Sequence, residues 1–228
     1  MSQVLVMAKA PQPGRVKTRL CPPCSPEQAA AVAEAALATT LAAVATSGAT
    51  RRIVALDGPP GPWLPPGFDV VEQRGDGLAE RLANAWAAAG DEGVQIGMDT
   101  PQVSAADLDS ALETLATPGT DAVLGPARDG GWWLIGLRNP RAVASEAFAG
   151  VPMSAPNTGA AQLTRLAQLG LRVSLVPWRR DVDRWADATA VAATVPATPF
   201  AEAVRQVAET LPRPSAPEPR RQRVEAAA

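Results

Sequence analysis

The first stretch that suggests chemistry is a basic loop that follows a short apolar run. Within eleven residues it carries Lys9, Arg15, Lys17 and Arg19. These include both lysines of the chain, whose other basic residues are all arginine. Lysine supplies a compact ammonium and arginine a planar fork, and both bind phosphate oxygens. The loop therefore suggests a phosphate site, with an ordinary solvated basic loop as the alternative.

Carboxylates follow two later apolar runs and suggest a metal site. Asp99 ends one run, while Asp181 and Asp183 follow the last one. Two carboxylates from two strand ends could hold one Mg²⁺ or Mn²⁺ against a diphosphate, because Mg²⁺ takes one or two carboxylates and fills its shell with water and phosphate. The alternatives are a turn residue at Asp99 and helix-capping residues at Asp181 and Asp183.

A glycine-rich acidic loop suggests the place of a second substrate. Asp129 is followed by Gly130 and Gly131, and then by Trp132. Paired glycines allow a ligand to approach the backbone, and Trp132 could stack on a base or a sugar. Asp129 could bind sugar hydroxyls or a second metal. A hairpin turn is the alternative, since Asp-Gly is its commonest signal.

The residues that are absent exclude several mechanisms. The chain has neither histidine nor tyrosine, so there is no Ser–His–Asp triad, no Cys–His pair and no imidazole metal ligand. Cys21 and Cys24 form a C-x-x-C pair, but no second pair completes a zinc site. Acid–base chemistry then falls to Asp and Glu, and any metal is expected to be held by oxygen.

Length and composition predict one sizeable α/β domain. The 228 residues are 46% hydrophobic and carry a formal net charge of −2. That balance gives no global field for nucleic acid, so any anion site is local. We expect a cytoplasmic protein, because the sequence shows neither a leader nor an apolar run that approaches the ~20 residues of a membrane span.

Hydrophobic patterning and turn signals predict the elements that position these residues. Predicted strands cover residues 4–8, 52–57, 68–73, 93–98, 121–124, 132–137 and 172–177. Predicted helices cover 27–46, 78–89, 105–116, 140–148, 157–169 and 197–211, with another that could begin near 184. This alternation predicts a three-layer Rossmann-like domain over residues 1–211, with a mostly parallel sheet. Residues 212–228 are expected to be a disordered tail.

The parallel sheet would bring the polar loops together. In such sheets ligands lie beyond the carboxyl ends of the strands. The basic loop, Asp99, the Asp129 loop and the segment with Asp181 and Asp183 each follow a predicted strand. We therefore expect all four at one edge of the sheet.

Several of these runs, in this order, resemble a bacterial family of glycosyltransferase-like proteins, some of them assigned to arsenosugar biosynthesis. The runs are Ala8–Leu20, Gly97–Pro101, Gly125–Leu137 and Asp181–Asp183. The resemblance covers roughly residues 3–190. The family is similar to nucleotide-diphospho-sugar transferases of glycosyltransferase-A fold, and more distantly to phospholactate and molybdenum-cofactor guanylyltransferases.

The resemblance implies roles for individual residues. The nucleotide would be bound by Ala8, Lys9, Gly14, Arg15, Lys17, Thr18 and Arg19, with Arg81 and residues 75–78 at the nucleoside. Asp99 and Asp183, with Asp181 as the weaker choice, would hold the metal, Lys17 and Asp129 would join Asp99 in catalysis, and residues 129–132 would face the acceptor. One departure is Met153-Ser154-Ala155, where the family has a Trp-Ser-Thr run. A different acceptor, or lost activity, would follow from that change.

Three functions fit these residues. The first is metal-dependent glycosyl transfer from a nucleoside-diphosphate sugar to a small acceptor, with the metal stabilising the leaving diphosphate. The second is nucleotidyl transfer from a nucleoside triphosphate to a phosphorylated small molecule, with release of pyrophosphate. Clustered cations at Lys17 and Arg19 suit the second, and the resemblance favours the first. The third is nucleotide binding without catalysis.

Overall fold

A seven-stranded sheet forms the centre of the protein in a computed structural model that describes residues 2–211. Its strands run in the order β3-β2-β1-β4-β6-β5-β7. They are β1 (Gln3–Lys9), β2 (Arg51–Asp57), β3 (Asp69–Glu72), β4 (Gly93–Gly97), β5 (Ala122–Pro126), β6 (Trp132–Leu137) and β7 (Val173–Leu175). The predicted mostly parallel α/β sheet is confirmed, and the expected tail at 212–228 lies outside the described residues.

One strand runs against the others. β6 is antiparallel to both of its neighbours, β4 and β5, whereas the other paired strands are parallel. β5 and β6 form a hairpin, so the turn between them lies at the carboxyl edge of β1 and β4. Because β6 is reversed, β4 and β5 point the same way, and the loops that follow these two strands lie at the same edge of the sheet.

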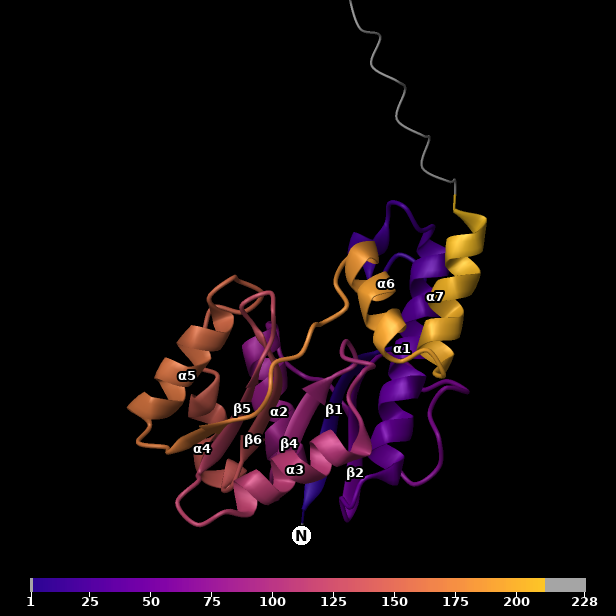
Figure 1. The fold of residues 1–228 in the computed structure, drawn as a ribbon. Coiled ribbons are helices and arrows are strands. Elements are labelled where there is room, and N and C mark those ends of the chain that lie inside the picture. The colour runs from indigo at the N-terminus through magenta and orange to yellow at the C-terminus, as the bar shows by residue number, and fades with distance from the viewer. Residues whose placement is uncertain (1, 212–228) are drawn as a thin grey trace, which may run out of the picture.

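Helices cover both faces of the sheet (Figure 1). They are α1 (Pro26–Thr46), α2 (Leu78–Ala89), α3 (Ala105–Ala116), α4 (Pro140–Ala147), α5 (Thr158–Gln168), α6 (Trp185–Thr194) and α7 (Pro199–Thr210), with a short 3₁₀ helix at Thr18–Leu20. Leu37 of α1 and Leu108 of α3 are buried against one face. Leu82 and Trp86 of α2 are buried against the other. The strands are therefore apolar on both sides, as in covered parallel sheets.

The first helix begins where its sequence signals predict. The Ser25 hydroxyl accepts a hydrogen bond from the Gln28 backbone N–H, and the Gln28 side chain accepts one from Ser25 N–H. Pro26 occupies the first helical position, where its missing N–H costs nothing. This capping box fixes where the basic loop ends and the helix begins.

A third, smaller core lies above the carboxyl edge of the sheet. There α6 and α7 pack on the amino-terminal half of α1, at the upper right of Figure 1. Leu20, Val182 and Phe200 are buried in this cluster. The end of the basic loop and the segment before α6 are thus anchored by the same helical unit.

The helix α1 is long and apolar enough, by length and composition, to cross a membrane. In its most apolar window, 56% of the residues are buried inside the protein, against the sheet and α7. Core helices of globular domains meet the same criterion. The buried contacts of α1 with the sheet and with α7 are those of such a core helix.

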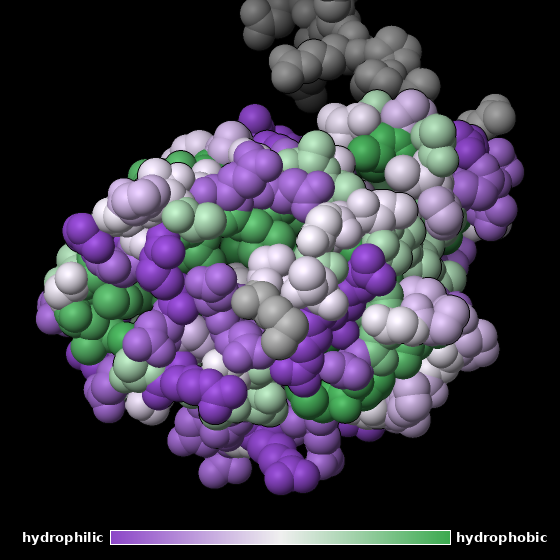
Figure 2. Space-filling model, turned by 90° about the horizontal axis from the view of Figure 1, so that it is seen from below, coloured by the Kyte–Doolittle hydropathy of each residue, from purple (hydrophilic) through white to green (hydrophobic). Residues whose placement is uncertain are grey.

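The opposite edge of the sheet looks different. Figure 2 views the molecule from that side, where hydrophilic residues predominate and apolar ones form separate small areas. The polar loops with predicted chemistry lie at the other edge, where the cavity is found.

Candidate active site

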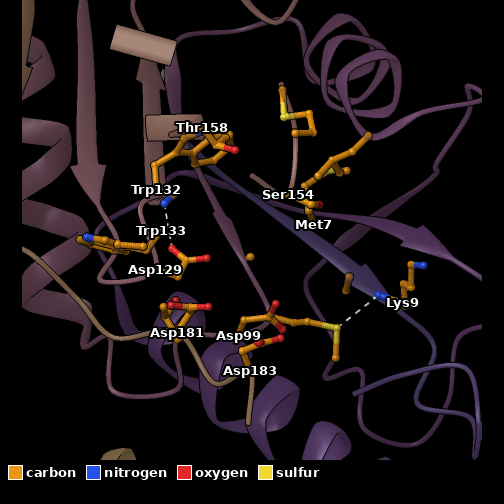
Figure 3. A pocket seen from close by; sticks show the side chains of 18 of the residues that line it. Met7, Lys9, Asp99, Asp129, Trp132, Trp133, Ser154, Thr158, Asp181 and Asp183 are labelled. Atoms are coloured by element: carbon orange, nitrogen blue, oxygen red, sulfur yellow. Dashed lines mark hydrogen bonds between the residues drawn. The ribbon is translucent and has the colours of Figure 1, made fainter. Parts of the chain in front are cut away.

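A cavity of about 480 Å³ opens beyond the carboxyl ends of β1 and β4. All four of the polar loops singled out in the sequence contribute to its wall. Figure 3 shows Asp99, Asp129, Asp181 and Asp183 gathered on one side, with Trp132 and Thr158 farther along and Lys9 across from them. The expectation that these loops meet at one edge of the sheet is met in the structure.

Lys17 is the central contact of the basic loop. Its ammonium is 2.8 Å from Asp99 Oδ1 and donates a hydrogen bond to the Val182 carbonyl. The side chain is only 12% exposed, and the backbone has a left-handed φ of 49°. Such a conformation is uncommon for a residue with a Cβ. Lys17 therefore joins the basic loop, the end of β4 and the segment before α6.

The other cations of the loop are more exposed. Arg19 Nη1 is 3.1 Å from Asp183 Oδ2, and Lys9 Nζ is 3.8 Å from Asp57 Oδ2. Arg15 also lines the cavity and has no ion-pair partner among residues 2–211. An anionic ligand would therefore meet Arg15 directly and would draw Lys17 and Arg19 from their carboxylates.

The segment 176–184, called the strap below, carries Asp181 and Asp183 from β7 to α6. Val182 donates a backbone hydrogen bond of 2.8 Å to the Asp99 carbonyl. Arg179 pairs with Asp107 and lies 5.6 Å from the ring centroid of Trp133. The strap is therefore held before its acidic part, at Arg179, and within it, at Val182.

The carboxylate loop, residues 127–131, is held by backbone packing. Asp129 Oδ1 accepts a hydrogen bond of 2.8 Å from Gly131 N–H. The Gly130 carbonyl accepts one of 2.7 Å from Gly159 N–H, near the start of α5. Gly130 has φ +91°, and a Cβ there would lie 1.8 Å from the Pro156 carbonyl oxygen. Asp-Gly-Gly is thus a hairpin turn, and Asp129 and Gly131 of this turn also line the cavity. The hairpin and the ligand-facing loop, given as alternatives for this sequence, are therefore compatible.

The strap and the carboxylate loop run beside each other. Arg128 N–H donates to the Arg179 carbonyl, and Arg179 N–H donates to the Pro126 carbonyl. This short ladder brings Asp181 close to Asp129. Burial, together with the charges of Asp129 and Asp99, raises the pKa of Asp181 from 3.8 to about 6. Negative charge is therefore concentrated on this side of the cavity.

The carboxylates fit a hard divalent cation by their chemistry. Asp99, Asp129, Asp181 and Asp183 place carboxylate oxygens around one cavity, and burial together with the neighbouring negative charge raises the pKa of Asp181. Within residues 2–211, no three acidic or cysteine side chains are already grouped as a complete metal site. Such a set suits an ion that takes one or two carboxylates and completes its shell with water and phosphate.

Most of the predicted site residues line the cavity. They are Ala8, Lys9, Arg15, Lys17, Thr18, Arg19, Asp99, Asp129, Gly131, Trp132 and Asp183. Gly14, Gly130 and Arg81 are outside this set. Arg81 Nη1 instead lies 2.9 Å from Asp57 Oδ2, and its Nε donates to the Gly75 carbonyl.

Two glutamines of the wall were missed in the sequence. Gln73 donates through Nε2 to the carbonyls of Ala8 and Ala55, at 2.8 Å each, and Gln95 lies within β4. Gln95 interrupts an otherwise apolar strand, and this was the one signal available. Thr158, at the start of α5, also lines the wall, and its hydroxyl is bonded to the Pro152 and Ala155 carbonyls.

The C-x-x-C pair lies beside the site, but it does not line the cavity. Cys21 and Cys24 are both reduced, and Cys24 is buried in the third core. Burial, with a smaller effect of Cys21, raises the pKa of the Cys24 thiol to about 11. The Cys24 thiol is therefore a poor nucleophile at neutral pH. Cys21 packs against the same core.

Sequence comparison identifies a family. A family model described as an uncharacterized protein conserved in bacteria (DUF2064) matches residues 28–155. The match includes Asp99, the carboxylate loop and Met153–Ala155. A comparison with curated proteins found no match.

Solved structures share the fold. A protein from Desulfovibrio desulfuricans G20, provisionally described as a nucleotide-diphospho-sugar transferase, is 26% identical with a TM-score of 0.81, covering 90% of this chain and 95% of that one. A nucleotidyl transferase from Methanothermobacter thermautotroptrophicus is 17% identical with a TM-score of 0.59, covering 90% and 99%. Rv0371c from Mycobacterium tuberculosis H37Rv, solved with manganese, is 22% identical with a TM-score of 0.51, covering 84% and 98%. The last two likenesses show the fold alone.

Proposed function

The chain belongs to the bacterial protein family DUF2064, and from its site we propose that it is a metal-dependent transferase acting on a nucleotide-sugar. The reaction we favour is glycosyl transfer from a nucleoside-diphosphate sugar to the hydroxyl of a small acceptor. One observation carries the proposal. Cations of the basic loop and carboxylates of three other segments face one cavity, and Lys17 and Asp99 join the two groups at 2.8 Å.

The basic loop is proposed to hold the diphosphate. Arg15 reaches the cavity without a partner among the described residues, and Lys17 and Arg19 would exchange their carboxylates for phosphate oxygens. Charge-assisted hydrogen bonds of this kind are worth about 1.5–3 kcal/mol each. A divalent cation held by Asp99 and Asp183 would neutralise the leaving diphosphate.

The acidic side is proposed to receive the acceptor. In glycosyl transfer the acceptor oxygen bonds to the anomeric carbon, the bond from that carbon to the diphosphate breaks, and the acceptor loses a proton. Asp129 lies beside Trp132 on the wall away from Lys9, where its carboxylate could take that proton. A hydroxyl acceptor needs such a base, whereas a phosphate acceptor is already ionised. This difference favours glycosyl transfer.

Nucleotidyl transfer is the second candidate. The density of cations in the basic loop suits the charge that builds up around a reacting phosphorus atom. In that reaction the acceptor phosphate attacks the α-phosphorus of a nucleoside triphosphate and pyrophosphate leaves. The fold likeness to a nucleotidyl transferase is compatible with this alternative.

A product assay distinguishes the two reactions. The chain is incubated with Mg²⁺ or Mn²⁺ and either nucleotide-sugars with hydroxyl acceptors or nucleoside triphosphates with phosphorylated metabolites. We expect nucleoside diphosphate to be released in the first mixture, and Asp129→Asn to slow its release by about 10²-fold or more. Pyrophosphate release that depends on Lys17 would replace glycosyl transfer with nucleotidyl transfer.

A binding assay tests the metal–diphosphate site itself. We expect UDP, GDP or CDP to raise the melting temperature only with Mn²⁺ or Mg²⁺, and Asp99→Ala to remove that rise. Glu113→Gln, on the exposed side of α3, is the matched control and keeps it. Stabilisation that survives Asp99→Ala would contradict the site, and binding without any turnover would indicate a nucleotide-binding protein.

A further inference from the structure

One side of the cavity, called the recess here, is apolar and lies against the α2 and α4 face of the sheet. Its wall is formed by Met7, Leu82, Trp132 and Met153. These side chains belong to the core on that face or pack against it. Gln95, on the same face of the sheet as Met7, lines the cavity as well and is buried. The recess is therefore chemically unlike the charged part of the site.

Gln95 has no internal reason to be polar. It lies in the middle of β4, opposite Leu5 of β1 and Ile135 of β6, and it is 1% exposed. Its Oε1 has no hydrogen-bond partner. An unpaired buried polar group costs about 1–3 kcal/mol, so folding alone would favour an apolar residue here. Gln95 thus brings a buried amide without a partner for its oxygen to an apolar part of the cavity wall.

Gly97 leaves the way to Gln95 open. Residues 95 and 97 point to the same face of β4, because side chains alternate along a strand. A Cβ at Gly97 would meet only the Asp99 backbone nitrogen, at 3.9 Å. Trp132 Nε1 is a second buried polar atom without a partner, on the same wall. Two polar side chains of the recess wall, Gln95 and Trp132, therefore each have a buried atom without a partner.

We propose that the recess binds the body of the acceptor, a slender and largely apolar group that carries one hydroxyl or amide to Gln95. This proposal rests on the transferase function proposed above. A sugar ring fits poorly, because its many hydroxyls need more partners than two. A phosphate is excluded from the recess, since the cations lie in the basic loop. The acceptor would thus be a small apolar alcohol or amide.

A pair of matched fluorinated probes tests the recess. Binding of 4-fluorobenzyl alcohol and of 4-fluorotoluene to the full chain is followed by ¹⁹F NMR. We expect saturable binding of the alcohol, retained when Mn²⁺ and a nucleoside diphosphate are added. Gln95→Leu weakens the alcohol at least fivefold and leaves 4-fluorotoluene bound as well or better.

Two further variants separate binding from folding. Gly97→Val fills the open space on a strand that accepts β-branched residues, and it abolishes binding of both probes. Gln162→Leu is the matched control, because Gln162 is also buried with an unpaired Oε1 but lies outside the cavity. It leaves both probes unaffected. Circular dichroism confirms that each variant is folded.

Three results would overturn the proposal. The first is the absence of saturable binding, and the second is equal binding of the probes by the wild type and both recess variants. The third is competition by uridine or guanosine that Gln95→Leu weakens, which would assign the recess to the nucleobase. Nucleoside-diphosphate stabilisation is measured separately. If the probe binds and the nucleotide does not, the recess stands and its acceptor role falls with the proposed function.

Discussion

The two loops that face each other across the cavity are built in different ways. The cations of the basic loop that face the cavity pair with carboxylates of other segments, Lys17 with Asp99 and Arg19 with Asp183. The carboxylate loop is held by backbone, with Gly130 wedged against Pro156 and bonded to Gly159. Charge pairs can exchange partners when a ligand arrives, whereas a backbone wedge cannot. One side of the site is therefore adaptable and the other is rigid.

The largest effect is expected at the rigid loop. Gly130→Ala places a Cβ 1.8 Å from the Pro156 oxygen at φ +91°, so the loop or α5 has to move. We expect the free energy of unfolding to fall by about 3 kcal/mol or more. Urea denaturation measures it. A loss below about 1 kcal/mol would show that this loop yields as readily as the basic one.

The next effect concerns the exchangeable pair. Lys17→Met removes a cation from Asp99, so Mn²⁺ alone should bind several-fold more tightly. Nucleoside diphosphate should bind about tenfold or more weakly, because one charge-assisted bond is lost. Calorimetry measures both affinities, and Arg74→Met, at an exposed pair, is the control. If both affinities move in the same direction, Lys17 does not exchange between the two partners.

A pH effect tests Asp181 of the strap, which lies beside the rigid carboxylate loop. The pKa of Asp181 is about 6 in the folded chain against an ordinary 3.8, so its ionisation favours unfolding. The stability that protonation provides is present below about pH 4 and is lost as the pH rises through about 6. At pH 8 the free energy of unfolding of Asp181→Asn should therefore exceed that of the wild type by about 1–2 kcal/mol. This value is reduced from the full pKa shift because solvent screens a partly exposed carboxylate.

Thermal melting at pH 4 and pH 8 measures this difference. The wild type and Asp181→Asn should be nearly equal at pH 4. Millimolar Mn²⁺ at pH 8 should narrow the gap, because a cation relieves the same repulsion. An equal difference at both pH values would show that the carboxyl acts through packing and not through charge.

The smallest effect is expected at the basic loop. Gly14 also has a positive φ, +73°, but a Cβ there would meet nothing within 4 Å. Gly14→Ala should therefore cost only about 1 kcal/mol, the strain of the left-handed conformation. Urea denaturation beside Gly130→Ala compares the two loops directly. Equal losses would contradict the difference between them.

The fold could be predicted because local signals agreed with one another. The prediction for β6 matches the strand Trp132–Leu137, and the prediction for α2 matches Leu78–Ala89. The capping box at Ser25 placed the start of α1. The antiparallel direction of β6 was not predicted, since an Asp-Gly hairpin and a glycine-rich ligand loop look alike in sequence.

The site was predicted as a set of loops but not as a set of contacts. Strand-end positions sufficed to bring Asp99, Asp129 and Asp183 to one cavity. The pairing of Lys17 with Asp99 depends on a left-handed turn and a distant strap, which spacing does not encode. Gln95 was missed because one polar residue in a strand has many structural explanations. The role proposed for Gln95 depends on the space left by Gly97 and on the apolar side chains of the recess.

The strap has a consequence for how the protein is made. Lys17 leaves the ribosome early, yet the carbonyl that receives its hydrogen bond belongs to Val182, 165 residues later. The sheet core from β1 to β6 uses residues up to Leu137 and can form before that point. The polar groups of the cavity are therefore brought together last, when α6 and α7 close on α1. A nascent chain would hold a nearly complete scaffold while the wall of its cavity is still incomplete.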